Sequence, residues 1–407
     1  MTNRIRAALI SISVVLMSYV VVGRVLGNSQ ASSEKTYRDL GVYSEVLNRI
    51  KQEYVTDPDL KKVTDGAIRG LLESLDPYST YLTAQEYQDY LQHPDPGPAD
   101  VGIFASKRMG YATVVAVLPG SPAEKAGVKP GDLIDEINGV PARQFSVLQL
   151  EREMAGQPGT SVKITMVREG NTDPESITIT RAALNYPPAV AKIVDDGNGY
   201  IRVATFNKGM AREIAAKVKD LESQGAHKII LDLRDCAGGD VQEAVDTVSL
   251  FLDKGLVTYL AGQRFPRQNV DVHPTGPVCT LPLAVLINQS TAGPAELVAS
   301  ATLGNKRGEV VGVRSFGVGV YEKPIPVGDG SALLLAVAKY YGWDGKAISD
   351  NGVTPSVVQT AGGQSESADG DDDNQPEEPE HFGGKDDLQL RKAIEILNQA
   401  GTAAKAA

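Results

Sequence analysis

Cysteine and histidine are scarce in this chain, which restricts the chemistry that depends on them. Its 407 residues include 2 cysteines and 4 histidines. No His-x-x-x-His or Cys-x-x-Cys spacing occurs, so no metal site is expected, and nothing points to a cofactor. Cys236 follows one expected strand and Cys279 precedes another. If these strands are parallel neighbours, the sulfur atoms lie at opposite ends of the sheet, so a disulfide is not expected.

The chain also has no excess of basic residues. The formal net charge is −11, and eight acidic residues lie between Glu366 and Glu380 with no basic residue among them. Without these eight residues, the formal net charge of the rest of the chain is −3. A nearly neutral body has no basic face for nucleic acid, which is excluded as an expected partner. Residues 362–384 are acidic and poor in large apolar side chains, which predicts a disordered linker.

The N-terminus combines early arginines with an apolar run. The run from Ala7 to Val22 is uncharged and reaches membrane-spanning length if it extends to Gly27. This order is typical of an export signal, so residues 1–28 are predicted to be a signal-anchor or a signal peptide. No clear cleavage site follows, which favours an anchor at residues 7–27 in the cytoplasmic membrane. The rest of the chain is then expected on the periplasmic or extracytoplasmic face.

The first half of the remaining chain has two kinds of pattern. In residues 36–92, apolar residues such as Val46, Ile50 and Tyr54 recur at helical spacing, which predicts a helical region. Residues 101–181 instead alternate short apolar runs with Gly- and Pro-containing turns, which predicts a compact unit with strands. Its expected strands are Tyr111–Val117, Leu133–Ile137 and Ser161–Val167.

Residues 182–360 alternate between strand and helix patterns. Such alternation predicts an α/β core with a largely parallel sheet covered by helices. Residues 385–407 are predicted to form a C-terminal helix with one apolar face. The expected core strands are Tyr200–Ala204, Lys228–Leu233, Leu283–Asn288 and Glu309–Gly312, and the expected core helices are Met210–Ser223, Val241–Phe251 and Ala295–Leu303.

The middle unit resembles the PDZ domain of bacterial proteases. The segments that carry the likeness are Gly120–Ala123, Ala126–Asp132 and Ile137–Gly139. The resemblance implies an α+β fold in which a peptide C-terminus adds a strand to the sheet edge. Its terminal carboxylate would be bound by backbone N–H groups of Val101, Gly102, Ile103 and Phe104. A PDZ domain that serves only as an internal regulatory module is the alternative.

The flanking segments resemble the C-terminal processing (tail-specific) peptidases, serine peptidase family S41, which use a Ser–Lys dyad. The likeness rests on Leu75–Leu82, Ile230–Gly239 and Gly352–Pro355, and it extends over residues 36–360 with the PDZ domain inserted. It implies a ClpP/crotonase-like α/β core. By the same resemblance, the turn at Gly238 and Gly239 would supply the oxyanion hole.

The dyad of that family is not preserved. The family's Ser-Ala-Ser-Ala-Ser-Glu is replaced by Thr-Ala-Gly-Pro-Ala-Glu, which puts Gly293 at the nucleophile position. Its Phe-Gly-Lys-Gly-x-Val-Gln is replaced by Phe-Gly-Val-Gly-Val-Tyr-Glu, which puts Val318 at the base position and Glu322 at the orienting glutamine. Glycine has no side chain and valine cannot accept a proton, so a Ser–Lys mechanism is excluded.

Other residues offer poor substitutes. Ser290 and Thr291 precede the nucleophile position and should point elsewhere, and Lys323 is expected on the opposite face of a strand. Cys236 lies in the glycine turn, but a cysteine nucleophile needs a base, and His227 is expected at the far end of the preceding strand. A small buried core cysteine is therefore the favoured interpretation of Cys236.

Two classes of function stay open. The favoured one is an inactive pseudopeptidase that binds polypeptide C-termini or unstructured tails, or scaffolds other proteins, at the membrane. The alternative is an active serine-type endopeptidase, cutting near protein C-termini, whose nucleophile is not recognised. Residues 36–92 and 386–400 have apolar helical faces outside the core, so a homo-oligomer is expected, or a complex with an active paralogue.

Overall fold

The computed structural model describes most of the chain beyond its N-terminus, and it divides there into two compact units, up to Gly70 and from Leu71. The expected export segment at residues 1–28 and most of the acidic segment 362–384 lie outside the described residues. Across the described ranges, no helix is long and apolar enough to cross a membrane. Those ranges are 40–93, 97–168, 173–274, 276–349, 351–361, 382–384 and 386–406, with side chains described up to 399.

The unit that ends at Gly70 is helical. Residues 40–53 form a helix, and α2 (Leu60–Glu73) follows it. Of the apolar residues that predicted the first helix, Val46 and Tyr54 are exposed, at 50% and 61%, and Ile50 is half-buried. Within this unit the apolar face is therefore left partly uncovered.

An antiparallel sheet forms the unit that resembles a PDZ domain. Its strand order is β3-β4-β5-β8-β9, with β6 (Val140–Pro141) paired to β5. Alternate residues of β8 point into the core, where Val162 and Ile164 are fully buried. Ser146 caps α5 (Val147–Met154) in a capping box, and α5 packs beside β3. The strands are β3 (Ile103–Arg108), β4 (Tyr111–Val117), β5 (Leu133–Ile137), β8 (Ser161–Val167) and β9 (Glu175–Thr180), and the short helix before β5 is α4 (Pro122–Lys125).

The core is a six-stranded sheet with the order β10-β11-β12-β15-β16-β19. All neighbouring pairs are parallel except β10 with β11. Both faces are apolar, because Ile229 and Ile230 on one strand pack into different clusters. The strands are β10 (Val190–Val194), β11 (Asn198–Arg202), β12 (Lys228–Asp232), β15 (Leu283–Ile287), β16 (Gly308–Gly312) and β19 (Val357–Val358).

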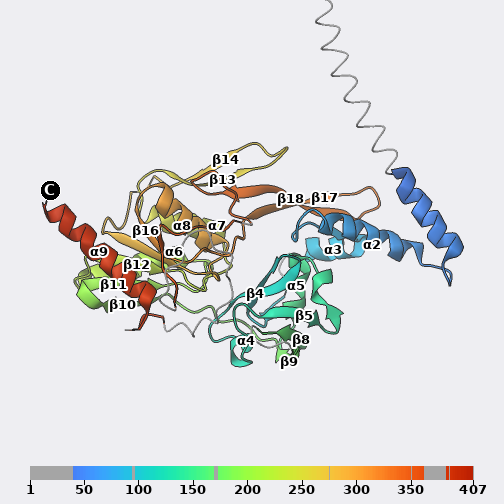
Figure 1. The fold of residues 1–407 in the computed structure, drawn as a ribbon, viewed down its shortest axis with the longest axis horizontal. Helices are drawn as coiled ribbons and strands as arrows, with labels where there is room; N and C mark the ends of the chain where they lie inside the picture. Colours follow the sequence, from blue (N-terminus) through green and yellow to red (C-terminus); the bar gives the residue numbers. More distant parts are fainter. Residues whose placement is uncertain are drawn as a thin grey trace, which may run out of the picture. The chain divides into compact units, whose positions relative to one another are not determined.

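Helices cover both faces of this sheet. On one face lie α6 (Met210–Ser223), α7 (Val241–Ser249) and α8 (Pro294–Gly304). On the other face α9 (Leu388–Ala406) packs on β12, β15 and β16 (Figure 1). Leu390 and Leu397 are each 3% exposed there. The apolar face of the C-terminal helix, one of the two expected oligomer surfaces, is thus covered by the chain's own core.

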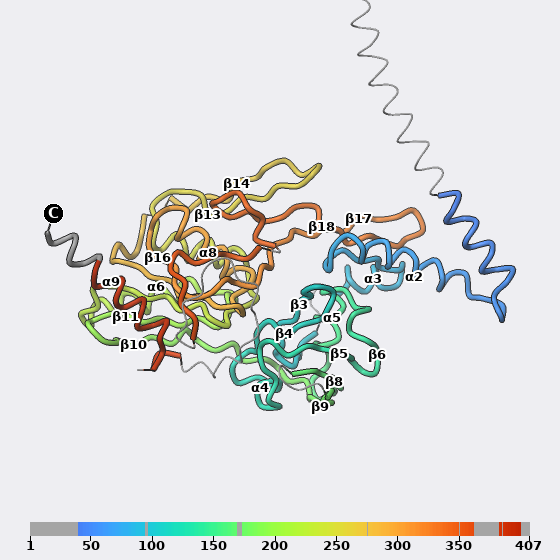
Figure 2. Tube along the Cα trace, viewed as in Figure 1, coloured from blue at the N-terminus to red at the C-terminus, as the bar shows by residue number. Residues whose placement is uncertain are grey.

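A second, antiparallel sheet was not predicted from the sequence. Its path is β1-β18-β13-β14, with β17 paired to β18 as a long hairpin (Figure 2). The hairpin carries the strand on which Glu322 and Lys323 lie. The strands are β1 (Thr80–Leu82), β13 (Leu256–Ala261), β14 (Gln268–Asp271), β17 (Val320–Pro326) and β18 (Ala332–Tyr341).

Candidate functional site

Gly293 lies in the sharp turn between the end of β15 and the start of α8. Its backbone angles are φ 63° and ψ −121°, which side chains of L-residues rarely adopt. A Cβ placed there would meet nothing within 4 Å. A strained strand-to-helix turn is the place where hydrolases expose a nucleophile. Here the turn is formed, there is room for a side chain, and glycine leaves it empty.

The Glu296 carboxylate links both altered dyad positions. Its Oε2 accepts the N–H groups of Gly293 and Val318, each at 2.8 Å. Its Oε1 accepts the Gly317 N–H at 2.8 Å and the Ser315 hydroxyl at 2.5 Å. The side chain is fully buried, and burial raises its pKa to about 7 against the lowering effect of these four donors. Glu296 therefore holds the loop of Val318 against the first turn of α8.

The space around the altered dyad is apolar. Val318 and Phe316 pack with Ala237 and Ala292, and Phe104 of the PDZ domain joins them. The guanidinium of Arg108 lies 5.8 Å from the centroid of the Phe316 ring, and a guanidinium stays protonated and cannot act as a base. Among the residues of this apolar cluster, no side chain can accept a proton from a nucleophile.

The glycine turn after β12 has two residues with positive φ angles. Gly238 and Gly239 have φ values of 71° and 102°. A Cβ on Gly239 would lie 2.3 Å from the carbonyl of Phe206, and one on Gly238 would lie 2.2 Å from the ring of Phe104. Glycine is required at both positions by close approach. Their use as an oxyanion hole stays a prediction.

Comparisons with known proteins identify the family. The model of peptidase family S41 matches residues 197–359, a PDZ-domain model matches residues 113–168, and a model of the N-terminal domain of the activating protease CtpB matches residues 20–86. The carboxy-terminal-processing protease of Bartonella bacilliformis is 30% identical over 364 residues, which cover 87% of this chain and 82% of that protein. The chain belongs to peptidase family S41.

Further S41 relatives agree. The carboxy-terminal processing protease CtpA of Bacillus subtilis is 31% identical over 336 residues, which cover 82% of this chain and 71% of that protein. Among solved structures, the photosystem II D1 C-terminal processing protease aligns with a TM-score of 0.65 at 24% identity, covering 78% of this chain and 92% of that chain. The predicted fold class, an α/β core with an inserted PDZ domain and N-terminal helices, is confirmed.

Glu322, at the orienting position of the S41 pattern, lies near other carboxylates. It lies on β17, and the charges that act on it are those of Glu151 on α5 and Asp76. Burial, followed by these two carboxylates, raises the pKa of Glu322 to about 7. Its Oε1 is buried and has no hydrogen-bond partner. Glu322 is thus a carboxyl group in an unfavourable environment, with no base to orient.

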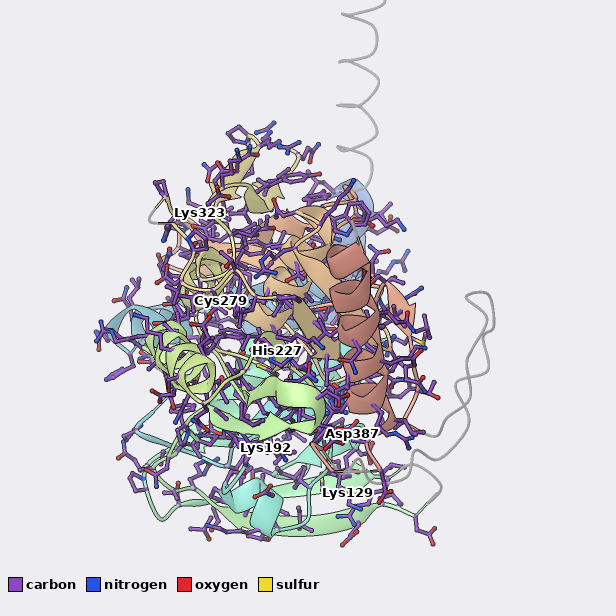
Figure 3. The ribbon with its side chains drawn as sticks, turned by 90° about the vertical axis from the view of Figure 1, so that its left-hand side faces the viewer. Lys129, Lys192, His227, Cys279, Lys323 and Asp387 are labelled. Carbon is purple, nitrogen blue, oxygen red and sulfur yellow. The ribbon has the colours of Figure 1, made fainter. Side chains whose placement is uncertain are left out.

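The other nucleophile candidates are occupied or inert. Cys236 is fully buried, and burial raises the pKa of its thiol, which confirms a core cysteine and no thiolate. Cys236 and Cys279 are both unpaired, as predicted. The Thr291 hydroxyl donates to the Leu233 carbonyl at 2.7 Å. Lys323 is exposed on β17 (Figure 3).

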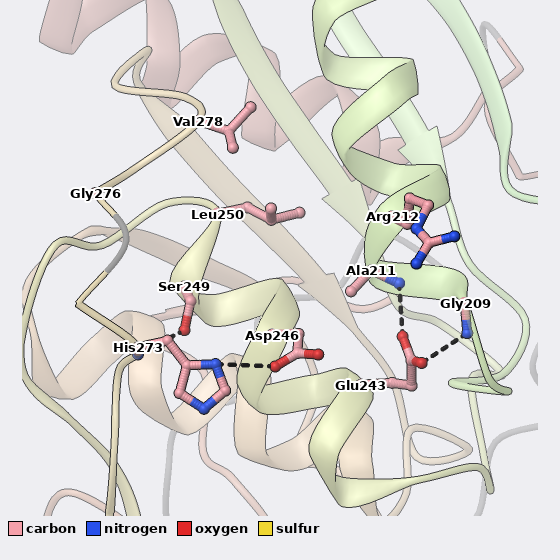
Figure 4. Close-up of a pocket in the computed structure, with 10 residues that line it drawn as sticks. All are labelled: Gly209, Ala211, Arg212, Glu243, Asp246, Ser249, Leu250, His273, Gly276 and Val278. Carbon is pink, nitrogen blue, oxygen red and sulfur yellow. Dashed lines mark hydrogen bonds and ion pairs between the residues drawn. The ribbon is translucent and has the colours of Figure 1, made fainter.

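A cavity of about 320 Å³ lies elsewhere, beside the start of α6 (Figure 4). It contains Ser249, His273 and Asp246, the residue types of a catalytic triad. The Asp246 carboxylate lies 3.1 Å from Nδ1 of His273, but the Ser249 hydroxyl donates to the Val245 carbonyl and accepts the backbone N–H of His273. The imidazole does not take the serine proton, so these residues do not form a triad.

A buried charge network ties the C-terminal segment to the end of β12. Arg234 donates to both oxygens of Asp232 and both oxygens of Asp387, at 2.6 to 2.9 Å. The Tyr200 hydroxyl donates to Asp232 at 2.6 Å, and the Arg234 guanidinium lies 4.5 Å from the Phe382 ring centroid. Figure 3 shows Asp387 at the start of α9. Sequence reasoning missed this network, although an Asp and an Arg inside an apolar strand pattern are a signal for it.

In the segment Val101–Phe104, predicted to bind a peptide carboxylate, one backbone amide is already engaged. Val101 is fully buried and Ile103 is 8% exposed. A Cβ on Gly102 would lie 2.3 Å from Cβ of Ser121, so only glycine fits there. The Gly102 N–H donates to the side chain of Asp100, a residue that the sequence pattern did not single out.

Proposed function

We propose that this chain is a catalytically inactive member of peptidase family S41 that binds polypeptide C-termini or unstructured tails through its PDZ domain. One observation carries the inactivity. The nucleophile and base positions are Gly293 and Val318, and both contribute only backbone N–H groups, which Glu296 accepts. A reaction that needs a hydroxyl and a neutral amine has neither group at this place.

The peptide-binding half of the proposal rests on the open edge of the PDZ sheet. In the part of the chain that the structure describes, β3 is hydrogen-bonded on one edge only, to β4. The other edge is free to take an added strand, and α5 packs beside it. A C-terminal peptide bound there would place its carboxylate at the amides of Val101–Phe104.

The test is a cleavage assay with the full chain, purified in detergent. The substrate is a carrier protein that ends in the unstructured tail Gly-Ser-Gly-Ser-Ala-Leu-Val-Ala, and mass spectrometry follows the tail beside a Gly293→Ser/Val318→Lys double variant. The native chain is expected to leave the tail intact. If it cuts, the assignment of the lost dyad is wrong, and Cys236 and Ser290 are the first residues to replace.

We also propose that the protein acts at the extracytoplasmic side of the cytoplasmic membrane, anchored by residues 7–27. The uncharged run that follows the N-terminal arginines supports this placement. Membrane fractionation with external protease treatment of intact spheroplasts tests it. The chain should sediment with the membrane and be digested from outside, and a cytosolic, protected chain would contradict the proposal.

A homo-oligomer, or a complex with an active paralogue, is proposed through the N-terminal helices. The support is the uncovered apolar face of residues 40–53, on which Val42 is 58% and Val46 50% exposed. Sedimentation of the full chain should show a species larger than a monomer. Val42→Glu/Val46→Glu should reduce its size, and an unchanged distribution would argue against this surface.

A further inference from the structure

Asp100 stands directly before the carboxylate-binding loop and is held by backbone pairing on two sides. β2 (Ala99–Asp100) pairs antiparallel with β7 (Ala155–Gly156). Asp100 and Ala182 also exchange backbone hydrogen bonds of 3.0 and 3.1 Å. The backbone of Asp100 is therefore fixed, and its side chain has a defined position relative to the loop.

The side chain of Asp100 occupies the loop's own donors. Its Oδ1 accepts the Gly102 N–H at 2.6 Å. The Val101 N–H also stabilises the carboxylate of Asp100. An N–H group carries a single proton, so the Gly102 amide cannot make this hydrogen bond and also bind a peptide carboxylate at full strength. The carboxylate of Asp100 thus lies where the terminal carboxylate of a bound peptide is expected.

The charges around Asp100 are mixed. Arg181 stabilises its ionised form, as do the two amides, but burial has the larger effect and raises the pKa of Asp100. Glu151 on α5 and Tyr186 are the other titratable groups that interact with it. Burial, and then Asp100, raises the pKa of Glu151 to about 6. A second carboxylate that enters the loop meets like charge and only one arginine.

We propose that Asp100 is a specificity-determining residue of the PDZ domain. Its side chain competes with the C-terminal carboxylate of a peptide for the Gly102 N–H, so the peptide must displace Asp100 or bind while Asp100 is protonated. This inference rests on the proposed function, the binding of C-termini by the PDZ domain. Two carboxylates that share one site are not both ionised without cost, so peptide binding takes up a proton. Affinity for a free C-terminus should rise as the pH falls.

The experiment measures binding of fluorescein-labelled Gly-Ser-Gly-Ser-Ala-Leu-Val-Ala, as free acid and as C-terminal amide, to the full chain in detergent. Asp100→Asn keeps an oxygen acceptor for the Gly102 N–H and removes the charge, whereas Asp100→Ala removes both. Asp135→Asn is the matched control, because Asp135 is an exposed PDZ aspartate on β5. Thermal melts of all four proteins confirm that they are folded.

Asp100→Asn should bind the free acid about 10-fold more tightly than the native chain at about pH 7.5. Asp100→Ala should bind at least as tightly as Asp100→Asn, and Asp135→Asn should match the native chain. Between about pH 7.5 and about pH 5 the native affinity should rise, and the rise should be smaller in Asp100→Asn, in which only the contribution of Glu151 is left.

The outcomes separate this inference from the proposed function. If all four proteins prefer the free acid over the amide but bind it equally at both pH values, Asp100 is not a competitor, while the binding of C-termini stands. If no protein distinguishes the free acid from the amide, the PDZ domain does not read the terminal carboxylate, and both proposals fail.

Discussion

Two buried carboxylates of the core, Asp232 at the end of β12 and Glu296 in the first turn of α8, are stabilised in different ways. Asp232 and Glu296 are both fully buried. Burial opposes the ionisation of Asp232, but Arg234 and other partners outweigh it, so its pKa lies below the usual value. Glu296 has only neutral donors, and its pKa is raised to about 7. Asp232 is thus stabilised by a buried guanidinium, whereas the groups that donate hydrogen bonds to Glu296 are all neutral.

The largest expected effect comes from removing Asp387, one of the two carboxylates that pair with Arg234. Asp387→Ala leaves Arg234 with one carboxylate fewer in a buried site, so the free energy of unfolding should fall by about 3–5 kcal/mol. Urea denaturation measures it. Asp386→Ala, at the exposed neighbouring residue, is the control and should change stability by less than about 0.5 kcal/mol. If Asp387→Ala and Asp386→Ala lowered the free energy of unfolding equally, the ion pair of Arg234 with Asp387 would not be what stabilises this region.

The second test removes the carboxylate of Glu296, whose hydrogen-bond donors are all neutral. Glu296→Ala leaves the N–H groups of Gly293, Gly317 and Val318 without their acceptor, so stability should fall by about 2–4 kcal/mol. The folded pKa of about 7 is above the usual 4.5, so the stability that Glu296 contributes is present at low pH and is lost as the pH rises through this interval. The deficit of the variant should therefore be larger at about pH 4 than at about pH 8. A deficit that does not depend on pH would contradict the raised pKa.

The third test concerns backbone strain at the former nucleophile position. Gly293→Ser should destabilise the protein by about 1–3 kcal/mol, because serine must adopt a φ of 63° although its side chain has room. Gly328→Ser is the control, since Gly328 is exposed, also has an open Cβ position and lacks the positive φ. A loss no larger than that of the control would show that the turn relaxes without cost.

The smallest expected effect is a gain. Glu322→Gln removes a carboxylate that faces Glu151 and Asp76, so it should stabilise the protein by about 1–2 kcal/mol at about pH 8. The pKa of Glu322 is raised from 4.5 to about 7, so the native side chain is protonated in both states at about pH 4 and the gain should disappear there. Denaturation midpoints at the two pH values measure this. A gain of the same size at both would point to packing and not to charge.

Local patterns predicted most of the fold. The strands β4, β5 and β8 and the helix α6 begin and end at the predicted residues, because alternating burial and a glycine at the helix start are encoded locally. A strand was expected at Lys323, but its pairing with β18 in a hairpin was not predicted. β17 contains Pro324 and Pro326, which are tolerated in a strand at a sheet edge, and an edge is where β17 lies.

The candidate site was only partly predictable. Gly293 and Val318 were recognisable from the sequence, because neither residue carries the hydroxyl or the amine that the family's dyad requires. The hydrogen bonds of Glu296 and the contact of Asp100 with Gly102 depend on which backbone N–H groups the fold turns toward each carboxylate. No spacing rule encodes that direction, and the pairing of Arg234 with Asp387 joins residues 153 positions apart.

This last separation bears on when the protein finishes folding. A chain that emerges N-terminus first exposes β12 and Arg234 long before Asp387 follows. Until then the sheet can cover its α6–α8 face, but Arg234 has only Asp232 of its two carboxylate partners, and the helix for the other face is missing. The sheet face that α9 covers therefore closes only after Asp387 and α9 have been synthesised. A chain that terminates before Asp387 should stay partly open and be a ready target for quality-control proteolysis.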